Sequence, residues 1–291
     1  MPIAEEINRA EYAARPIVSV IVRAKNEEAL LGETLRLLHA QSFRAAEILL
    51  IDSGSTDRTL EIARGFPGVR VIEIPPEDFT FGRALNIGCT HSSGEILVFI
   101  SAHALPGTDQ WMARLLKYFD DSRVVGVWGG QRRRPGAGHA PRVVYQDLAM
   151  FRRNIYFGFN NSNCALRKSV WEKYPFHEGM PGSEDKEWAH RVLSDGHVLV
   201  HDSEAFVYHR HDDSIRQAWW RAHREQIGLA QFAPDHRVKL TENFWYAYYA
   251  LIVAWGGTKG LPGRGRLFAR KAAGILAITV GRYTGNHRWL R

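Results

Sequence analysis

The sequence is poor in cysteine and has no apolar run long enough to cross a membrane. Its two cysteines, Cys89 and Cys164, offer neither a disulfide framework nor a Cys-x-x-Cys motif, which suits a reducing compartment. The first fifteen residues are charged and lack an apolar segment, so we expect no secretory signal peptide. The apolar run Phe244–Trp255 has twelve residues, whereas a spanning helix needs about twenty. We therefore expect a cytoplasmic protein.

Acidic residues are absent after Glu242, although eight Lys or Arg residues follow it. The rest of the chain carries 30 basic and 31 acidic residues, so the net charge of +7 comes from the C-terminal part. Nucleic-acid-binding proteins usually carry their basic patch on the folded domain, which argues against nucleic acid as a partner. Aromatic and basic residues together instead predict an interfacial helical region on an anionic membrane. The alternative is a helix pair packed on the preceding domain, with its basic side chains solvated.

Apolar strands and amphipathic helices alternate through the first part of the chain. This rhythm is typical of an α/β fold with a parallel sheet and right-handed crossovers. The hydrophobic content of 45% is enough for a sizeable core. Strands are predicted at 18–22, 46–51, 69–74, 96–100 and 124–130, and a further strand region at 196–205 leads to His209. The expected regions are an extension at 1–15, a large domain at 16–232 and a basic, aromatic-rich helical region at 233–291.

Polar residues follow two of these strands where each ends, and ligands of open α/β sheets bind beyond the carboxyl ends of strands. Asp52 can accept a hydrogen bond from a uracil or thymine N–H, and Ser55 can cap the following helix. Arg83 and Asn86, on one side of a later helix, suit a diphosphate or a sugar. The alternative is that Ser55 and Asp57 only cap a helix and that Arg83 is a surface residue.

The segments Val18–Val22, Asn26-Glu27, Glu47-Ile48 and Asp52–Asp57 resemble the N-terminal signature of family 2 glycosyltransferases. The resemblance covers about residues 16–232 and implies a GT-A fold, which is a Rossmann-like, mixed and mostly parallel sheet flanked by helices. A C-terminal helical extension would follow. The resemblance also implies a donor sugar linked to UDP, dTDP or GDP, and a donor-binding set of Arg23, Asn26, Glu27, Asp52, Arg83, Asn86, Ser101 and Ala102.

The Asp-x-Asp metal motif of such enzymes is missing, and Ser101, Ala102 and His103 stand in its place. Imidazole can replace a carboxylate as a ligand, although the exchange removes a negative charge and softens the site. His209 and His211 alternate, so both face the same side of an extended segment. We expect His103, with one of these two histidines, to bind Mn²⁺ or Mg²⁺. The alternative is that His103 only caps the strand end.

A Glu-Asp pair in Gly182–Trp188 resembles the motif that supplies the general base in inverting members of the family. The reaction needs a carboxylate that takes the acceptor hydroxyl proton as the oxygen attacks the anomeric carbon. The resemblance makes Asp185 this base and Glu184 an acceptor-orienting neighbour. Alternatively, Ser183 is an N-cap and both acids only favour the helix dipole. Further acceptor or sugar contacts are expected from Arg132, Asn161, Asn163 and Trp188.

Together these features predict an inverting, metal-assisted glycosyltransferase that acts on a glycan or lipid-linked acceptor. The chain looks most similar to bacterial enzymes of surface-polysaccharide assembly, including rhamnosyltransferase-like members, and we expect it at the cytoplasmic face of the inner membrane. One alternative is a sugar-nucleotide pyrophosphorylase, but Arg23–Asn26 lacks the Gly-rich loop of that class. Another is a degenerate nucleotide- or membrane-binding module, against which the intact Glu184-Asp185 pair argues.

Overall fold

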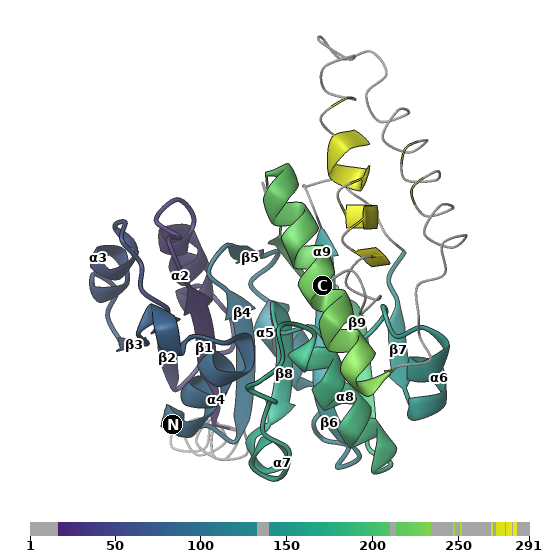
Figure 1. Ribbon diagram of the computed structural model, residues 1–291. Coiled ribbons are helices and arrows are strands. Elements are labelled where there is room, and N and C mark those ends of the chain that lie inside the picture. The colour runs from purple at the N-terminus through teal and green to yellow at the C-terminus, as the bar shows by residue number, and fades with distance from the viewer. Residues whose placement is uncertain are drawn as a thin grey trace. The chain divides into compact units, whose positions relative to one another are not determined.

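The computed structural model describes residues 17–132, 140–209 and 214–233, with short helical pieces between 247 and 283 (Figure 1). The chain divides into two compact units. The first contains Met1–Phe176 and Trp188–Arg210, and the second contains His177–Glu187 and His211–Arg291. The predicted N-terminal extension, His211 and most of the region 233–291 lie outside the described residues.

The described strands of the first unit pair into one mixed sheet, in the order β3-β2-β1-β4-β8-β6-β9-β5, with β7 paired to β9. β1, β2, β3 and β4 are parallel neighbours, whereas β8 joins β4 and β6 in antiparallel fashion. The strands are β1 (Val18–Ala24), β2 (Glu47–Asp52), β3 (Val69–Glu73), β4 (Ile96–Ser101), β5 (Ala104–Pro106), β6 (Val124–Arg132), β7 (Val143–Gln146), β8 (Asn163–Arg167) and β9 (Val198–His209). The predicted α/β fold with a mixed sheet is confirmed.

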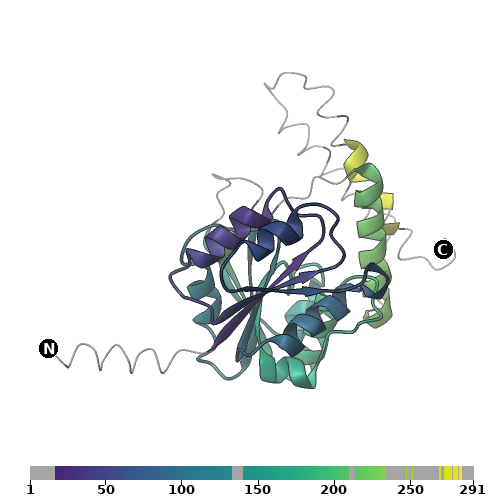
Figure 2. The same cartoon turned by 90° about the vertical axis from the view of Figure 1, so that its left-hand side faces the viewer.

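Helices cover both faces of this sheet, because alternate strand residues point to opposite sides. Val20 and Val22 of β1 belong to the core cluster that also contains apolar residues of α2 (Leu31–His39), α3 (Thr59–Arg64) and α5 (Trp111–Leu116). Ile21 faces the other way, toward α4 (Phe81–His91). A Cβ at Gly88 of α4 would lie 2.6 Å from Ile21, so glycine allows the close approach. Figure 2 shows α2 and α3 on one side of the strands and α4 on the other.

The remaining described elements of the first unit connect these layers. They are the 3₁₀ helix η1 (Pro76–Asp78), α6 (Leu148–Arg153) and α7 (Lys168–Lys173). α8 (Glu184–Ser194) begins in the second unit and ends in the first. Its buried Trp188 packs against Phe159 and Phe176, with ring centroids 4.8 and 6.0 Å away.

The second unit contains α9 (Ile215–Phe232) and the segment that leads into α8. Ser214 and Gln217 form a capping box at the start of α9, which satisfies its first backbone N–H groups. Ser183 precedes α8 with a φ of 63°, and its hydroxyl donates to the carbonyl of Glu225 at 3.1 Å. A Cβ at Gly228 would lie only 1.9 Å from the carbonyl oxygen of Gly182. Contact between these two backbones therefore fixes the entry into α8.

Candidate active site

Three predicted site residues lie in two successive rows at the carboxyl edge of the parallel strands. Arg23 of β1 pairs with Ser101 of β4, and Ala24 of β1 pairs with Asp52 of β2. This register follows from the parallel ladders, which bring successive strand ends to the same edge. It is the edge at which open α/β sheets bind ligands.

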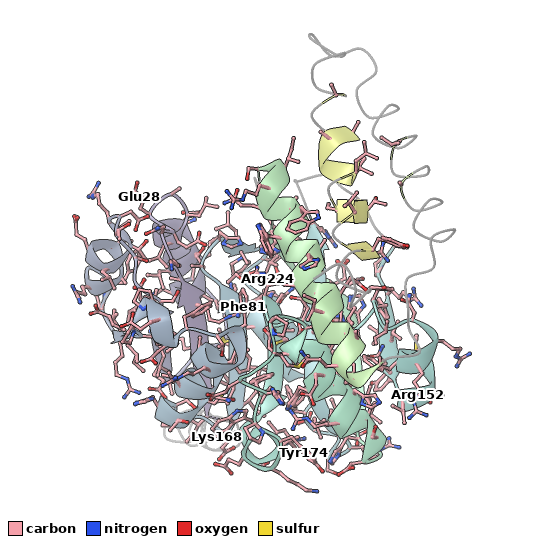
Figure 3. All side chains as sticks on the ribbon, in the orientation of Figure 1. Glu28, Phe81, Arg152, Lys168, Tyr174 and Arg224 are labelled. Carbon is pink, nitrogen blue, oxygen red and sulfur yellow. The ribbon has the colours of Figure 1, made fainter. Side chains whose placement is uncertain are left out.

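The loops after β1 and β2 are joined to each other by hydrogen bonds. Asn26 has a φ of 55°, its N–H donates to the Ser55 hydroxyl, and its side-chain oxygen accepts from Thr56 N–H, both at 2.8 Å. The N–H of Glu27 donates to the Thr59 hydroxyl at 2.7 Å. Figure 3 shows Glu28 on the same loop, close to α3. Ser55 and its neighbours thus hold two loops together in addition to leading into a helix.

Two aspartates shape the loop after β2. Asp52 is fully buried, and its Oδ1 accepts from the N–H groups of Gly54 and Ser55 at 2.9 and 2.8 Å. Burial raises the pKa of Asp57, but hydrogen bonds from Thr59 and from the Glu28 N–H lower it by more than burial raises it. The pKa of Asp57 therefore lies below its ordinary value. The predicted contact of Asp52 with a nucleobase stays a prediction, because in this structure its carboxylate bonds to its own loop.

Two of the predicted metal ligands face each other. The Nε2 atoms of His103 and His209 lie 2.9 Å apart, and their rings stack at 13° with centroids 4.8 Å apart. The antiparallel β5–β9 ladder produces this meeting, because it places His209 opposite Ala104, the residue after His103. On the other side of the ring, His103 Nδ1 lies 2.6 Å from a carboxylate oxygen of Glu27.

These groups form an array of Glu27, His103 and His209. Within the part of the chain that the structure describes, no three His, Cys, Asp or Glu side chains form a group that could hold a metal ion. The two imidazoles are therefore at most part of a donor set. His211, the other predicted ligand, is outside the described residues.

The two arginines expected at the donor lie near the carboxyl edge. The guanidinium of Arg23 lies 5.5 Å from the centre of the ring of Phe81. Phe81 is the first residue of α4 and is labelled in Figure 3. Arg83 lies in the first turn of the same helix and forms a 3.4 Å ion pair with Asp78. Both partners of this pair are more than 40% exposed, so the pair is a weak one in water.

Two of the predicted asparagines are bound firmly to the framework. The Asn86 amide donates to the Phe176 carbonyl, and its oxygen accepts from Trp171 Nε1 and the Phe176 N–H. Asn163 is fully buried, and its amide donates to the carbonyls of Gly130 and Ala205 at 2.9 Å each. Amide side chains that donate and accept at once thus tie distant segments together.

The other predicted contacts are also partly or wholly buried. Arg132 forms a 2.7 Å ion pair with Glu204, and its guanidinium lies 3.4 Å from the centre of the Phe206 ring. Ala102 is fully buried, and its carbonyl accepts from the Thr34 hydroxyl at 2.7 Å. Asn161 is 2% exposed. Ser101 keeps partial exposure at the end of β4.

The predicted catalytic pair lies in the first turn of α8. Glu184 is buried, whereas Asp185 is partly exposed and its Oδ1 accepts from the adjacent Lys186 N–H at 2.8 Å. Glu225 belongs to the same unit. Burial raises the pKa of Glu225 and the charge of Asp185 raises it further, while Lys186, Arg221 and Arg224 oppose the shift.

A depression of about 1130 Å³ lies at the opposite end of the sheet, where β4 begins and β8 ends. Figure 3 marks this end with Lys168 and the carboxyl edge with Glu28. Lys168 and Arg167 line the depression, but both donate to backbone carbonyls, those of Ser92 and Val124. None of the residues predicted to bind a donor, an acceptor or a metal lines this depression.

Among the described residues, no helix has the length and apolar character required to cross a membrane.

The mixed sheet, with polar loops after β1, β2 and β4, has the GT-A fold of glycosyltransferases. Residues 19–175 match the family described as glycosyl transferase family 2, which is more than half of the chain. The chain belongs to this family and is a glycosyltransferase. The expected resemblance to surface-polysaccharide enzymes is also confirmed by the curated relatives.

The chain is similar to the O-antigen chain rhamnosyltransferase RfbN of Salmonella typhimurium, with 23% identity over 70% of this chain and 69% of that enzyme. It is 30% identical to the glycosyltransferase AglE of Haloferax volcanii over 81% of each chain. Among solved structures, the mannosyltransferase PcManGT of Pyrobaculum calidifontis, in complex with GDP-Man and Mn²⁺, has a TM-score of 0.64. Its sequence identity is 20%, and the likeness covers 92% of this chain and 87% of that one.

The sequence alone missed one relationship in each of the two units. Glu27 was assigned to the donor, yet it lies against His103, 76 positions away in the sequence. No local pattern could show this contact, since it depends on the β1–β4 register. In the second unit, Glu225 had no assigned role, and the available signal was that it is the one acidic residue of α9, next to Arg224 and near Arg221.

Proposed function

We propose that this glycosyltransferase transfers a sugar, with inversion, from a nucleoside diphosphate to a hydroxyl group of a glycan or lipid-linked acceptor. The arrangement that carries the proposal is the meeting of His103 and His209 at the strand edge where Arg23, Asp52 and Ser101 also lie. It combines groups suited to a diphosphate and a cation at the ligand-binding edge of a GT-A sheet. The assignment of RfbN to O-antigen chains supports a polysaccharide acceptor.

Asp185 is the general base of the proposed reaction. Its carboxylate takes the proton of the acceptor hydroxyl while the acceptor oxygen forms a bond to the anomeric carbon. The bond between that carbon and the diphosphate breaks, and the nucleoside diphosphate leaves with the electron pair. Because attack comes from the face opposite the leaving group, the configuration inverts. The exposure of Asp185 in the first turn of α8 supports this role.

The donor set of His103 and His209 fits a divalent cation, Mn²⁺ or Mg²⁺. Their Nε2 atoms lie 2.9 Å apart, and imidazole nitrogen is a good ligand for first-row metals. A bound cation would neutralise charge that develops on the leaving diphosphate. Arg23, at the same edge, would bind the diphosphate oxygens with its planar guanidinium.

The proposed setting is the cytoplasmic face of a membrane, where the enzyme binds peripherally. Two large apolar side chains of α9 are exposed, Ile215 at 54% and Trp220 at 45%. In the C-terminal part, Leu276 is 53% exposed. Such side chains next to lysines and arginines favour binding to anionic lipid. Co-sedimentation with vesicles of anionic and of zwitterionic lipid checks this, and equal recovery with both would contradict it.

A donor screen tests the proposed reaction. The purified chain is incubated with UDP-, dTDP- and GDP-linked sugars and a bacterial membrane extract as the acceptor, and release of nucleoside diphosphate is measured. We expect release from one donor class, only with acceptor, and NMR of the product should show inverted configuration. Formation of nucleoside triphosphate from donor and pyrophosphate would indicate a pyrophosphorylase instead. Donor binding without any turnover would indicate a degenerate module.

A further inference from the structure

We infer that Glu27 is a positioning residue that holds His103 with its Nε2 lone pair toward His209, so that the pair selects a first-row transition cation over Mg²⁺. The inference rests on the proposed function in taking this point of the structure as a cation site. It adds the class of cation and a role for Glu27. It does not depend on which sugar or acceptor is used.

The hydrogen bond between Glu27 and His103 determines which ring nitrogen carries the proton. A carboxylate can only accept, so the His103 Nδ1 at 2.6 Å must be the donor. In the neutral ring, the lone pair then lies on Nε2. This is the atom that faces Nε2 of His209 at 2.9 Å. Glu27 thus leaves His103 ready to act as a ligand, as carboxylates behind metal-bound histidines do.

The position of both rings is fixed before any cation binds. Glu27 follows β1 on a loop whose N–H groups bond to Thr59 and Asp57. His209 is aligned by the β5–β9 ladder, opposite Ala104. Nitrogen–metal bonds of about 2.1 Å at right angles place two ligand atoms about 3 Å apart. The observed separation of 2.9 Å therefore suits two neighbouring ligands of one ion.

The chemistry of the two donors points to a class of cation. Mg²⁺ binds oxygen ligands and keeps much of its water, whereas imidazole suits metals from Mn²⁺ to Zn²⁺. The carboxylates of an Asp-x-Asp motif are replaced here by Ser101 and His103, so the oxygen donors and negative charge that Mg²⁺ prefers are reduced. Glu27 and His103 are each 21% exposed, which leaves them accessible to a small ion.

Metal binding by the purified full-length chain tests this inference without any substrate. Co²⁺, Mn²⁺ and Mg²⁺ are titrated separately by calorimetry, and the visible absorption of bound Co²⁺ reports nitrogen ligands. We expect Co²⁺ and Mn²⁺ to bind more tightly than Mg²⁺. Glu27→Gln should weaken Co²⁺ binding by about 10- to 100-fold, since an amide can also turn its NH₂ toward the ring and no longer imposes the tautomer. His103→Ala should abolish the Co²⁺ bands.

Glu33→Gln is the matched control, because Glu33 lies on α2, half-exposed, and pairs with Arg36. It should bind Co²⁺ as the wild type does. His103→Asp, which restores a carboxylate, should shift the preference toward Mg²⁺. Circular dichroism and the thermal midpoint of each variant establish that it is folded.

Each contrary result has a separate meaning. Equal Co²⁺ affinity of folded Glu27→Gln and wild type would overturn the role of Glu27. Equal affinity of the wild type for Mg²⁺ and Co²⁺ would overturn the selectivity. Acceptor-dependent transfer that persists in excess chelator would overturn metal assistance and with it this inference, but would leave glycosyl transfer itself intact.

Discussion

The backbone N–H of Thr56 donates a 2.8 Å hydrogen bond to the side-chain oxygen of Asn26. Asn26 stands at a φ of 55°, a left-handed conformation that asparagine tolerates better than most residues. One side chain thus joins the loops after β1 and β2, at a backbone conformation that this residue type tolerates. The carboxyl edge of the sheet depends on this connection for its shape.

Replacement of Asn26 should therefore loosen the proposed donor site. In Asn26→Ala the bond is lost and the left-handed backbone is strained, at about 1 kcal/mol each in the free energy of unfolding. Binding of the preferred nucleotide should weaken several-fold. Asn26→Gly loses the bond without the strain, so urea denaturation should place it between the wild type and Asn26→Ala. Nucleotide affinity that is unchanged in both variants would show that this loop does not form the donor site.

Replacement of Asp185 by Asn should remove the proposed base and leave the helix in place. Loss of a general base typically lowers the rate by about 10²- to 10⁴-fold, while nucleotide affinity should stay within twofold. Glu187→Gln is the control, since Glu187 is an acidic residue of the same helical turn. Nucleotide release and calorimetry measure the two effects. Near-normal turnover in Asp185→Asn would exclude Asp185 as the base.

Gly228→Ala should disturb the segment that leads into α8. The new Cβ would lie 1.9 Å from the Gly182 carbonyl, so either α9 or that segment has to move. Overpacking of this kind costs about 1–3 kcal/mol in stability, and turnover should fall more than nucleotide affinity. Gly32→Ala is the control, because its Cβ would lie 3.6 Å from Ile62, an ordinary contact. Helix propensity predicts a neutral or stabilising effect there, measured by urea denaturation.

His201 should make the protein less stable in mild acid. Its ring lies among Trp128 and Phe157, and burial lowers its pKa from 6.5 to about 4, although Asp202 opposes the shift. Below pH 6.5 the unfolded chain takes up a proton that the folded chain resists until about pH 4. Stability is therefore lost as the pH falls through this window. His201→Phe should lose less between pH 7 and pH 5 in urea titrations, and an identical loss would exclude His201 as the cause.

Much of the fold could be predicted because apolar strands and amphipathic helices alternate clearly before residue 130. The strand ends at Asp52 and Ser101 were located correctly, since the apolar runs stop there. β5, β7 and β8 were not predicted. β5 has three residues and β7 has four, so neither shows a useful period, and both pair with the distant β9.

At the candidate site, too, some relationships could be predicted from the sequence and others could not. His103 and His209 could be proposed as partners because both are histidines next to predicted strands, and the β5–β9 ladder brings them together. The framework roles of Asn86 and Asn163 could not be predicted, because polar side chains look alike in sequence whether they bind a ligand or a buried carbonyl. The Glu27 contact required the sheet register as well.

The short β5–β9 ladder gives the histidine pair a use as a reporter. Three residue pairs, from Pro106 with Val207 to Ala104 with His209, set the alignment. A slip of one residue would turn the His209 side chain to the other face of the strand and separate the two rings. With the proposed cation site, cation uptake during refolding would thus indicate when β9 has reached its correct register against β5, independently of any catalytic assay.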